Sequence, residues 1–303
     1  MIQDIAPHRF DNSYHISKPE MEDYVLCIQK NKVLLKAETQ LEEEAQKEPM
    51  YGIPTLQEIV KLVPDAKERA YHLFAIDEKP YYMVEIEAEE TVSLPEEEAY
   101  DWKGTSYMRV MEPMHQAFAA ITATQIWRWR VSRRFCGRCG VRTTESQTER
   151  AMVCPVCGQI EYPKISPAVI VAITNGDKLL MSRYRDRPYR GYALIAGFVD
   201  MGESFEETIH REVMEEVGLK VKNIRSFRSQ PWAFTDTEMI GFFAELDGAD
   251  QIKLQEDELS EAGWYTREEI PDDDTRISVA GELKMAFKYK TAEYLRGSSE
   301  EEA

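Results

Sequence analysis

The sequence predicts an α/β protein in which a mixed β-sheet lies between helices, preceded by a short cysteine-rich module and an α+β N-terminal domain. Two observations predict this organisation. Short apolar segments alternate with helical patterns at mixed spacings in the C-terminal half of the 303-residue chain. Upstream of them, four of the five cysteines form two C-x2-C pairs. We therefore expect domains at residues 1–130, 131–162 and 163–296, followed by a disordered tail at 297–303.

The composition argues against several classes of partner. The formal net charge of -18 opposes non-specific binding to nucleic acid or to anionic membranes. The longest apolar run, Ala168–Ile173, is far shorter than the roughly 20 residues that a membrane-spanning helix needs. No export signal is visible in the first residues. We therefore expect a cytoplasmic protein with no membrane partner.

The first 130 residues contain no motif that indicates a chemistry. A helical pattern over residues 113–130 leads directly into the cysteine-rich module. The two cysteine pairs are Cys136/Cys139 and Cys154/Cys157. The fourteen-residue spacer between them is just below the usual window of a four-cysteine zinc ribbon, but the pattern still indicates a zinc site.

Disulfides are the alternative for these pairs, but a cytoplasmic protein would not keep them. Four thiolates close a tetrahedral zinc site with no open position, so we expect one structural Zn2+. The fifth cysteine, Cys27, fits a small buried hydrophobe.

The C-terminal domain begins with a predicted hairpin. Residues 168–173 and 178–182 read as strands, and the segment Thr174-Asn175-Gly176-Asp177 between them predicts a type I′ turn. Further strands and a final helix follow, at residues 192–196, 224–228, 239–246 and 278–296.

A capped amphipathic helix is predicted over residues 205–217. Ser204 and Glu207 have the spacing of a capping box, and Gly218 supplies a left-handed stop. The apolar side chains recur on one stripe of this helix: Phe205, Ile209, Val213 and Val217.

Three glutamates of this helix predict a site for a divalent cation. Glu212, Glu215 and Glu216 lie at i, i+3 and i+4, and Glu216 falls inside the apolar sector. A carboxylate that faces a core is costly unless a cation meets it, and Mg2+ or Mn2+ prefers such oxygen ligands. The alternative interpretation is a solvated acidic face, which the inward Glu216 disfavours.

An arginine and a glycine-flanked loop accompany the glutamates. Arg211 can hold a neighbouring glutamate by a paired hydrogen bond, or form a plain i,i+4 salt bridge. Gly197 and Gly202 flank a short loop that ends at Glu203, and such glycines allow a ligand to approach the backbone, although turn geometry alone also explains them.

Written as one pattern, the segment from Gly197 to Leu219 reads G-x5-E-x7-R-E-U-x-E-E-x-G-U, where U is aliphatic, with every position filled. This segment resembles the signature box of the Nudix hydrolases. The resemblance implies a Nudix-type mixed sheet between helices and metal-assisted cleavage of a diphosphate linked to another group.

A second motif follows the box, at residues 229–237, which read SQPWAFTDT. Together with the cysteine module upstream, it is similar to the NADH pyrophosphatase branch of the Nudix hydrolases, which carries S-Q-P-W-x-F after the box. The resemblance covers roughly residues 109–296. Ala233 and Thr235 stand where members commonly carry proline, and Thr237 stands where they carry serine.

The resemblance implies site residues for this chain. Trp232 and Phe234 are expected to stack on a flat nicotinamide or adenine ring, while Gln230 offers amide hydrogen bonds. The predicted substrate-binding residues are Arg109, Glu149, Tyr162, Gln230, Pro231, Trp232, Ala233, Phe234, Thr235, Asp236, Thr237 and Ala280. The predicted catalytic residues are Glu203, Arg211, Glu212, Glu215, Glu216 and Glu258. Two or three Mg2+ or Mn2+ ions would be held by Glu212, Glu215, Glu216, Glu258 and the carbonyl of Ala196.

The implied reaction is hydrolysis of NADH or NAD to nicotinamide mononucleotide and AMP. The family also implies removal of NAD caps from RNA and a homodimer. Glu203, Glu215 and Glu258 remain alternatives for the general base.

Three alternatives remain open. The substrate can be ADP-ribose or another dinucleotide, given the changes at Ala233 and Thr235. The protein can be a catalytically silent nucleotide sensor. The cysteine module can also be a nucleic-acid-binding unit, since arginines crowd around it and around the loop at residues 183–190, where they either pair with acidic residues or attract phosphate.

Overall fold

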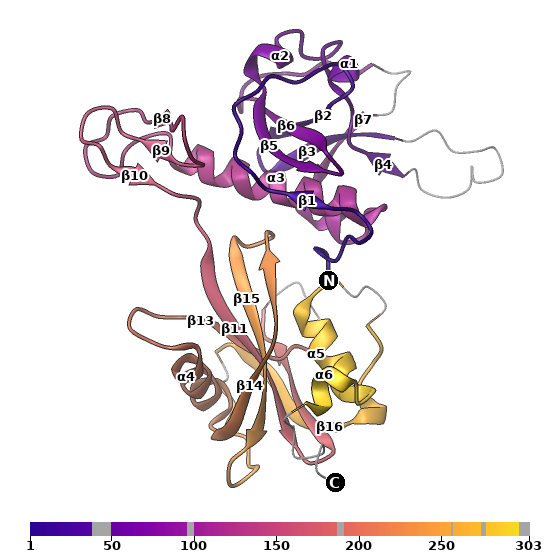
Figure 1. Ribbon diagram of the computed structural model, residues 1–303. Coiled ribbons are helices and arrows are strands. Elements are labelled where there is room, and N and C mark those ends of the chain that lie inside the picture. Colours follow the sequence, from indigo (N-terminus) through magenta and orange to yellow (C-terminus); the bar gives the residue numbers. More distant parts are fainter. Residues whose placement is uncertain (38–49, 96–99, 187–190, 256, 274–276, 297–303) are drawn as a thin grey trace, which may run out of the picture. The chain divides into compact units, whose positions relative to one another are not determined.

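The structure is a computed structural model that describes residues 1–37, 50–95, 100–186, 191–255, 257–273 and 277–296 (Figure 1). The predicted disordered tail at 297–303 lies outside these residues. The chain forms two compact units, which we describe separately. The N-terminal unit contains residues 2–164 together with 233–235, and the C-terminal unit contains Met1, residues 165–232 and the chain from 236 onward.

A mixed sheet with helices builds the first part of the N-terminal unit. Its strands are β1 Phe10–Asp11, β2 Tyr24–Gln29, β3 Lys32–Ala37, β4 Tyr51–Gly52, β5 Tyr71–Ile76, β6 Lys79–Glu85 and β7 Tyr100–Gly104. Its helices are α1 Leu56–Ile59, α2 Ala66–Arg69, η2 Thr105–Arg109 and α3 Met114–Ser132. The strand order is β1-β5-β6-β2-β3-β4, and β7 pairs with β3. Helices α1 and α2 share a core with one face, and α3 contacts β2, β3 and β6.

Helix α3 confirms the helix predicted over 113–130, because it begins after Pro113 and ends two residues beyond the predicted end. Cys27 is fully buried in the core of this unit, as expected for a small hydrophobe, and burial raises the pKa of its thiol to about 12.

The cysteine-rich segment forms a small three-stranded sheet in the same unit. Its strands are β8 Thr144–Glu145, β9 Met152–Val153 and β10 Ile160–Glu161, in the order β10-β9-β8. The contacts group this segment with the N-terminal residues, so a separate domain at 131–162 stays a prediction.

The C-terminal unit contains the predicted mixed sheet between helices. Its strands are β11 Ser166–Asn175, β12 Lys178–Tyr184, β13 Ile195–Phe198, β14 Val221–Trp232, β15 Thr237–Leu246 and β16 Leu259–Thr266. Its helices are α4 Phe205–Val217, η3 Arg267–Glu269, α5 Val279–Lys288 and α6 Ala292–Leu295. The strand order is β14-β15-β11-β12-β16, β13 pairs with β11, and β11 runs parallel to β15.

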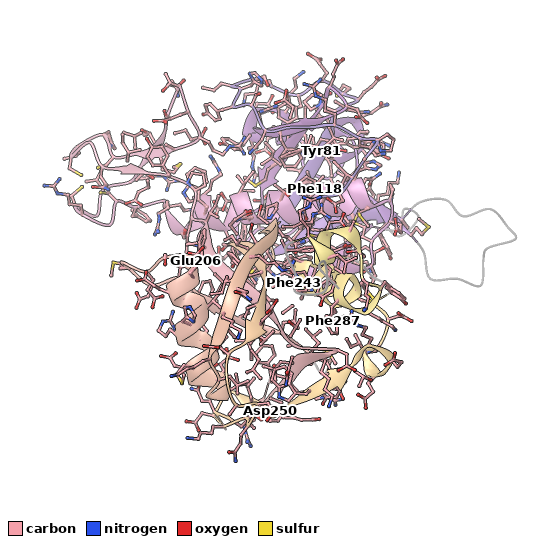
Figure 2. The ribbon with its side chains drawn as sticks, turned by 60° about the horizontal axis from the view of Figure 1, so that its bottom comes forward. Tyr81, Phe118, Glu206, Phe243, Asp250 and Phe287 are labelled. Carbon is pink, nitrogen blue, oxygen red and sulfur yellow. The ribbon has the colours of Figure 1, made fainter. Side chains whose placement is uncertain are left out.

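Alternating residues of β11 face two separate apolar cores. Val169 and Val171 lie in the core that contains the buried face of α4. Ile170 and Ala172 lie in the other core, with α5 and α6. Figure 1 shows α4 on one side of the sheet and α5 with α6 on the other, and Figure 2 labels Phe243 and Phe287 in the second core. The predicted layer order is therefore confirmed.

Two local predictions were wrong. The turn between β11 and β12 is not type I′, since Gly176 has a positive φ of 58° but Asp177 does not, and a positive φ only at the first central residue fits type II′. The single helix predicted over 278–296 is two helices, α5 and α6, because Lys290 adopts a left-handed φ of 48° between them. Among the described residues, none of the helices combines the length and the apolar character that a membrane span requires.

Candidate active site

Helix α4 has the bounds that the sequence predicted, and local contacts fix both ends. The Ser204 hydroxyl accepts the backbone N–H of Glu207 at 3.2 Å, and the Glu207 carboxylate accepts the backbone N–H of Ser204 at 2.7 Å. Gly218 ends the helix with a φ of 67°. The apolar stripe then packs on the sheet, with Ile209 and Val213 fully buried, so the acidic flank is held in one place.

Arg211 is the centre of a network of ion pairs on this flank. Its Nε and Nη2 donate to the two oxygens of Glu203 at 2.6 and 2.8 Å. Its Nη1 donates to Glu212 Oε1 at 2.6 Å and lies 3.4 Å from Glu215 Oε2. Its Nη2 also donates to the carbonyl of Phe198 at 3.1 Å. Arg211 therefore makes the paired hydrogen bond that the sequence suggested, and the weaker i,i+4 contact as well.

Glu203 is held as a carboxylate by three groups. Besides Arg211, the Thr208 hydroxyl donates to Glu203 Oε2 at 2.8 Å, and the N–H of Asp200 donates at 3.2 Å. The hydrogen bonds from Arg211 contribute most, and together these contacts lower the pKa of Glu203 to about 2. The sequence analysis missed Thr208, for which the only signal is a hydroxyl on the buried side of an amphipathic helix.

Glu203→Gln should make the stability of the fold less dependent on acid. The pKa of Glu203 in the folded state lies near 2, below its ordinary value of 4.5, so this carboxylate stabilises the fold above pH 4.5 and loses that effect as the pH falls toward 2. We expect the variant to melt below the wild type at pH 7 and together with it near pH 2. Thermal melts across this range test it, with the exposed Glu206→Gln as control; equal melting temperatures at pH 7 would contradict the prediction.

Gly197 gives the Glu212 carboxylate its place. A Cβ atom on Gly197 would lie 2.0 Å from Glu212 Cδ and Oε1 and 2.5 Å from Oε2. The carboxylate therefore lies directly over the backbone of β13, beside the residue whose carbonyl is a predicted metal ligand, Ala196. The glycine at this point of the box is required by close approach and not by a positive φ.

Glu216 faces inward, as its position in the apolar sector predicted. Only 3% of its surface is exposed, whereas more than half of the Glu215 side chain is exposed. Its own carbonyl accepts the N–H of Gln255 at 2.9 Å, which joins the end of α4 to the segment before β16. Glu258 lies on that segment, where its N–H donates to the Gln255 carbonyl at 3.2 Å and its side chain is exposed.

These residues fit a divalent cation by their chemistry. The predicted ligands are carboxylates and a carbonyl, which Mg2+ and Mn2+ prefer. Glu216 is buried, and a cation would stabilise the charged form of its carboxyl group. Among the described residues, the four cysteines form a group whose ligand atoms all lie within 4.8 Å of one another. The carboxylate oxygens of the predicted glutamate ligands do not form such a group in this part of the chain. Mutual repulsion and the pairing of Arg211 with Glu203 and Glu212 explain this separation.

The SQPW motif lies on a strand. Residues 229–232 form the end of strand β14, which lies at the edge of its sheet, where proline is tolerated. Gln230, Ala233 and Thr237 are buried, so their side chains are not available to a ligand in this structure. For Gln230 this corrects the prediction of an amide that contacts the substrate, because both ends of the amide bond the backbone near α5.

The other residues of this motif are more accessible. Pro231 and Thr235 are exposed, and Trp232 and Asp236 are half-buried. The guanidinium of Arg109 lies 4.3 Å from the centre of the Phe234 ring, so the structure brings together two residues that were predicted to bind substrate.

Two more predicted substrate contacts meet on the cysteine-rich segment. The Tyr162 hydroxyl donates to Glu149 Oε1 at 3.3 Å, and both side chains are exposed. The charge of Glu149 raises the pKa of Tyr162. Ala280 is half-buried in the first turn of α5 and packs against the adjacent core.

The four cysteines are positioned to bind zinc. Their sulfur atoms lie 3.6 Å apart for Cys136 and Cys157, 3.4 Å for Cys139 and Cys154, and 3.7 Å for Cys139 and Cys157. A tetrahedron of sulfurs at about 2.3 Å from zinc has edges of about 3.8 Å, whereas a disulfide needs about 2.05 Å. These separations favour zinc over disulfides.

Two matching backbone turns build this cluster. The N–H of Arg138 points at Cys136 Sγ at 3.4 Å, and the N–H of Cys157 points at Cys154 Sγ at 3.5 Å. Each turn closes on a glycine with positive φ, 74° at Gly140 and 71° at Gly158. The N–H of Cys157 lowers the pKa of Cys154 to about 6, which favours the thiolate that zinc binds.

Cys154→Ser should remove zinc and unfold the segment around it. Two of the four sulfurs belong to each turn, and the small strands β8 to β10 bury little apolar surface, so the metal supplies much of their stability. We expect one zinc per chain in the wild type and none in the variant, measured by atomic absorption, with new proteolytic cleavage within residues 131–162. Cys27→Ala is the matched control and should keep its zinc; a variant at Cys154 that keeps a full zinc content would contradict the site.

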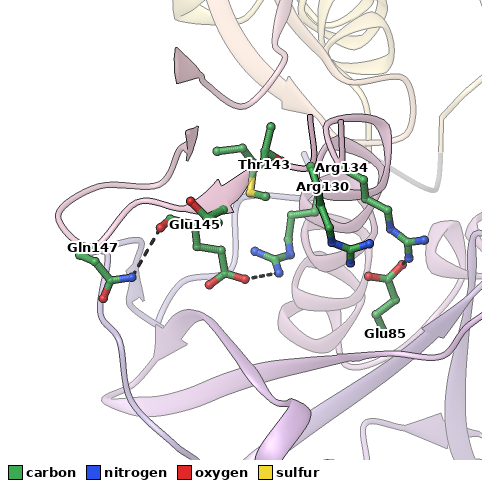
Figure 3. A pocket seen from close by; sticks show the side chains of 9 residues that line it. Glu85, Arg130, Arg134, Thr143, Glu145 and Gln147 are labelled. Carbon is green, nitrogen blue, oxygen red and sulfur yellow. Dashed lines mark hydrogen bonds and ion pairs between the residues drawn. The ribbon is translucent and has the colours of Figure 1, made fainter. Parts of the chain in front are cut away.

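Three of the arginines near the cysteine-rich segment are paired with acidic residues. Arg130 donates to Glu145, and Arg134 donates to Glu85 (Figure 3). These four residues line a cavity of about 340 Å3 in the N-terminal unit. Arg133 lies 3.4 Å from Glu161. Salt bridging therefore accounts for these three arginines, while Arg187 and Arg190 lie outside the described residues.

Comparisons with known proteins find family matches for the C-terminal unit and for the cysteine-rich segment. Residues 164–283 match the NUDIX domain family, and residues 132–162 match the NADH pyrophosphatase zinc ribbon domain. One curated relative is the NAD-capped RNA hydrolase NudC of Chromobacterium violaceum, 41% identical over 186 residues, which are 61% of this chain and 70% of the relative. Another, of the same name from Mannheimia succiniciproducens, is 43% identical over 169 residues, 52% of this chain and 63% of the relative. A solved Nudix hydrolase from Nitrosomonas europaea is 24% identical with a TM-score of 0.45, over 52% of this chain and 92% of that one.

Proposed function

The chain belongs to the family of NAD-capped RNA hydrolases named NudC, within the Nudix hydrolases, and on this premise we propose that it hydrolyses the diphosphate bond of NADH and NAD. Water adds to one phosphorus and the bond from that phosphorus to the bridging oxygen breaks. The products are AMP and nicotinamide mononucleotide, which is in its reduced form when the substrate is NADH. The observation that carries the proposal is the capped helix α4, on which Glu216 faces inward and the Glu212 carboxylate lies against Gly197.

The glutamates would hold Mg2+ or Mn2+ for this reaction. Glu212, Glu215, Glu216 and Glu258, with the carbonyl of Ala196, are the proposed ligands. When bound, the cations supply positive charge for the diphosphate oxygens and lower the pKa of a coordinated water. Arg211 contributes by fixing Glu203 and Glu212 with hydrogen bonds of 2.6 to 2.8 Å.

The contacts of Glu203 narrow the choice of general base. A carboxylate with a pKa of about 2 accepts a proton poorly near neutral pH, and three donors already occupy its oxygens. Glu215 and Glu258 have exposed side chains and remain the candidates. A proton acceptor must reach solvent or a bound water, which these two can do.

The proposal extends to larger substrates and to assembly. NAD-capped RNA contains the same diphosphate bond, so cap removal is the same reaction on a longer chain. Trp232 and Phe234 would stack on the rings of the substrate. The Arg109 guanidinium lies beside the ring of Phe234. We propose a homodimer in the cytoplasm, where the four zinc thiolates would stay reduced.

Product identification tests the proposal. The protein is incubated with NADH and Mg2+, and the products are separated and weighed by mass spectrometry. Reduced nicotinamide mononucleotide and AMP in equal amounts are expected, and their formation should stop when the divalent cation is chelated. Absence of turnover for all dinucleotides would favour the alternative of a silent nucleotide sensor.

Parallel assays rank the substrates. NADH, NAD, NAD-capped RNA and ADP-ribose are compared by kcat/KM under one condition. The proposal expects the nicotinamide substrates to be cleaved fastest, and fastest turnover of ADP-ribose would overturn the nicotinamide assignment.

A further inference from the structure

The side chain of Gln230 lies between strand β14 and the start of helix α5 and is fully buried. Its Nε2 donates to the carbonyl of Ile277 at 2.8 Å, and its Oε1 accepts the N–H of Val279 at 2.7 Å. The two backbone groups flank Ser278, so one amide clamps both sides of the helix N-cap. No surface of this side chain remains for a ligand.

The first turn of α5 depends on such partners. The first four N–H groups of a helix have no partner within the helix, and the Ser278 hydroxyl accepts one of them, from Gly281, at 3.2 Å. Gln230 accepts another, from Val279. Because this second acceptor comes from a different element, it also fixes where the helix begins relative to the sheet.

The sheet is shaped to receive this turn. A Cβ atom on Gly241 of β15 would lie 2.7 Å from Val279 Cγ2 and 3.3 Å from Leu283 Cδ1. The missing side chain at Gly241 therefore lets α5 approach β15 closely at Val279, the residue whose N–H Gln230 accepts. A shift of the helix would break the packing on Gly241 and the hydrogen bond to Gln230.

We propose that Gln230 is a positioning residue that sets the location of the first turn of α5, and so of Ala280, for the dinucleotide. The inference rests on the proposed function, because Ala280 is there a predicted substrate contact. Trp232 lies two residues further along the same strand, so the clamp also ties the end of β14 that carries this ring to α5. Gln230 acts through these neighbours and does not touch the substrate.

Two variants separate this role from a direct contact. Gln230→Leu removes both hydrogen bonds and leaves the Ile277 carbonyl and the Val279 N–H without their partner. Gln230→Glu keeps the shape of the side chain and the oxygen that accepts the Val279 N–H, but its ionised carboxylate would repel the Ile277 carbonyl. This variant replaces Gln230→Leu in the test if the leucine variant does not fold. Ser226→Ala, an exposed position on the same strand, is the control.

The measurements are hydrogen exchange of the amides of residues 279–283 and the kinetics of NADH hydrolysis. For Gln230→Leu we expect exchange about tenfold faster in this turn, since a buried hydrogen bond is lost. We expect KM to rise about tenfold and kcat to change less than about threefold, because binding and not the reacting glutamates is disturbed. Gln230→Glu should give smaller changes in the same direction, and Ser226→Ala none.

Two results would overturn the inference. A raised KM with unchanged exchange in α5 would mean that Gln230 contacts the substrate directly. Faster exchange with an unchanged KM would mean that the clamp stabilises the helix without serving binding. If the wild type hydrolyses no NADH, the proposed function fails instead, and the exchange measurement still reports separately on the clamp.

Discussion

Glu216→Gln should abolish most of the turnover while the fold is kept. The substitution removes one charge from the predicted metal ligands, and loss of one electrostatic stabiliser lowers kcat by about 100- to 1,000-fold. The side chain is 3% exposed and the amide has the same shape, so packing is conserved. A buried charge costs stability, and the metal-free variant should therefore melt at or above the temperature of the wild type.

Glu206→Gln provides the matched control, since Glu206 lies on the same helix but at the surface (Figure 2). Its kcat should stay within about twofold of the wild type, as for most surface substitutions. Thermal melts with and without Mg2+ add a readout that does not depend on activity, because a bound ligand raises the melting temperature and Glu216→Gln should lose that rise. Full activity of Glu216→Gln would dismiss the metal site.

Gly197→Ala should lower kcat/KM by about 100-fold, because displacement of a catalytic group by about 1 Å has that cost. The new methyl group would lie 2.0 Å from the Glu212 carboxyl carbon, so the carboxylate must move. It is the end of a flexible side chain and can rotate away, hence the melting temperature should fall by less than about 5 °C. Steady-state kinetics and thermal melts on the same sample test both parts.

Gly263→Ala controls for the loss of a strand glycine in the same unit. Its Cβ would be 3.4 Å from the nearest atom, on Tyr265, which is an ordinary contact. This variant should retain activity. If Gly197→Ala is fully active, Glu212 does not need its observed place, and its assignment as a metal ligand loses support.

Local signals explain why α4 was predicted to the residue. The Ser204 capping box and the left-handed Gly218 act within a few residues of the helix ends, and the apolar stripe is a periodicity of the same segment. The mixed sheet between helices was predicted from short apolar segments that alternate with helical patterns, which are also local signals. The inward position of Glu216 was predicted from the helical period alone, because this period places it on the apolar side of α4.

Sequence patterns did not predict contacts between residues that lie far apart in the chain. Gln230 bonds Ile277 and Val279, 47 and 49 residues away, and no pattern near the motif indicates this. The contact of Gly197 with Glu212 likewise joins a strand to a helix.

Turn chemistry explains other misses. The pairs Lys30-Asn31 and Asp77-Glu78 make hairpin turns with positive φ but contain no glycine, so they gave no signal. Lys290 breaks the final helix for a similar reason, since a lysine with a left-handed φ is not a recognised stop.

The parallel pairing of β11 with β15 sets when the C-terminal unit can mature during translation. The register runs from Ser166 with Thr237 to Thr174 with Glu245, so partners are 237 − 166 = 71 residues apart in the nascent chain. The middle of the sheet cannot close before β15 has been synthesised, and this strand ends at Leu246, 246 − 219 = 27 residues after the box ends at Leu219. Closure between partners so far apart in sequence is slow. Helix α4 is therefore synthesised before the sheet surface on which it packs is complete.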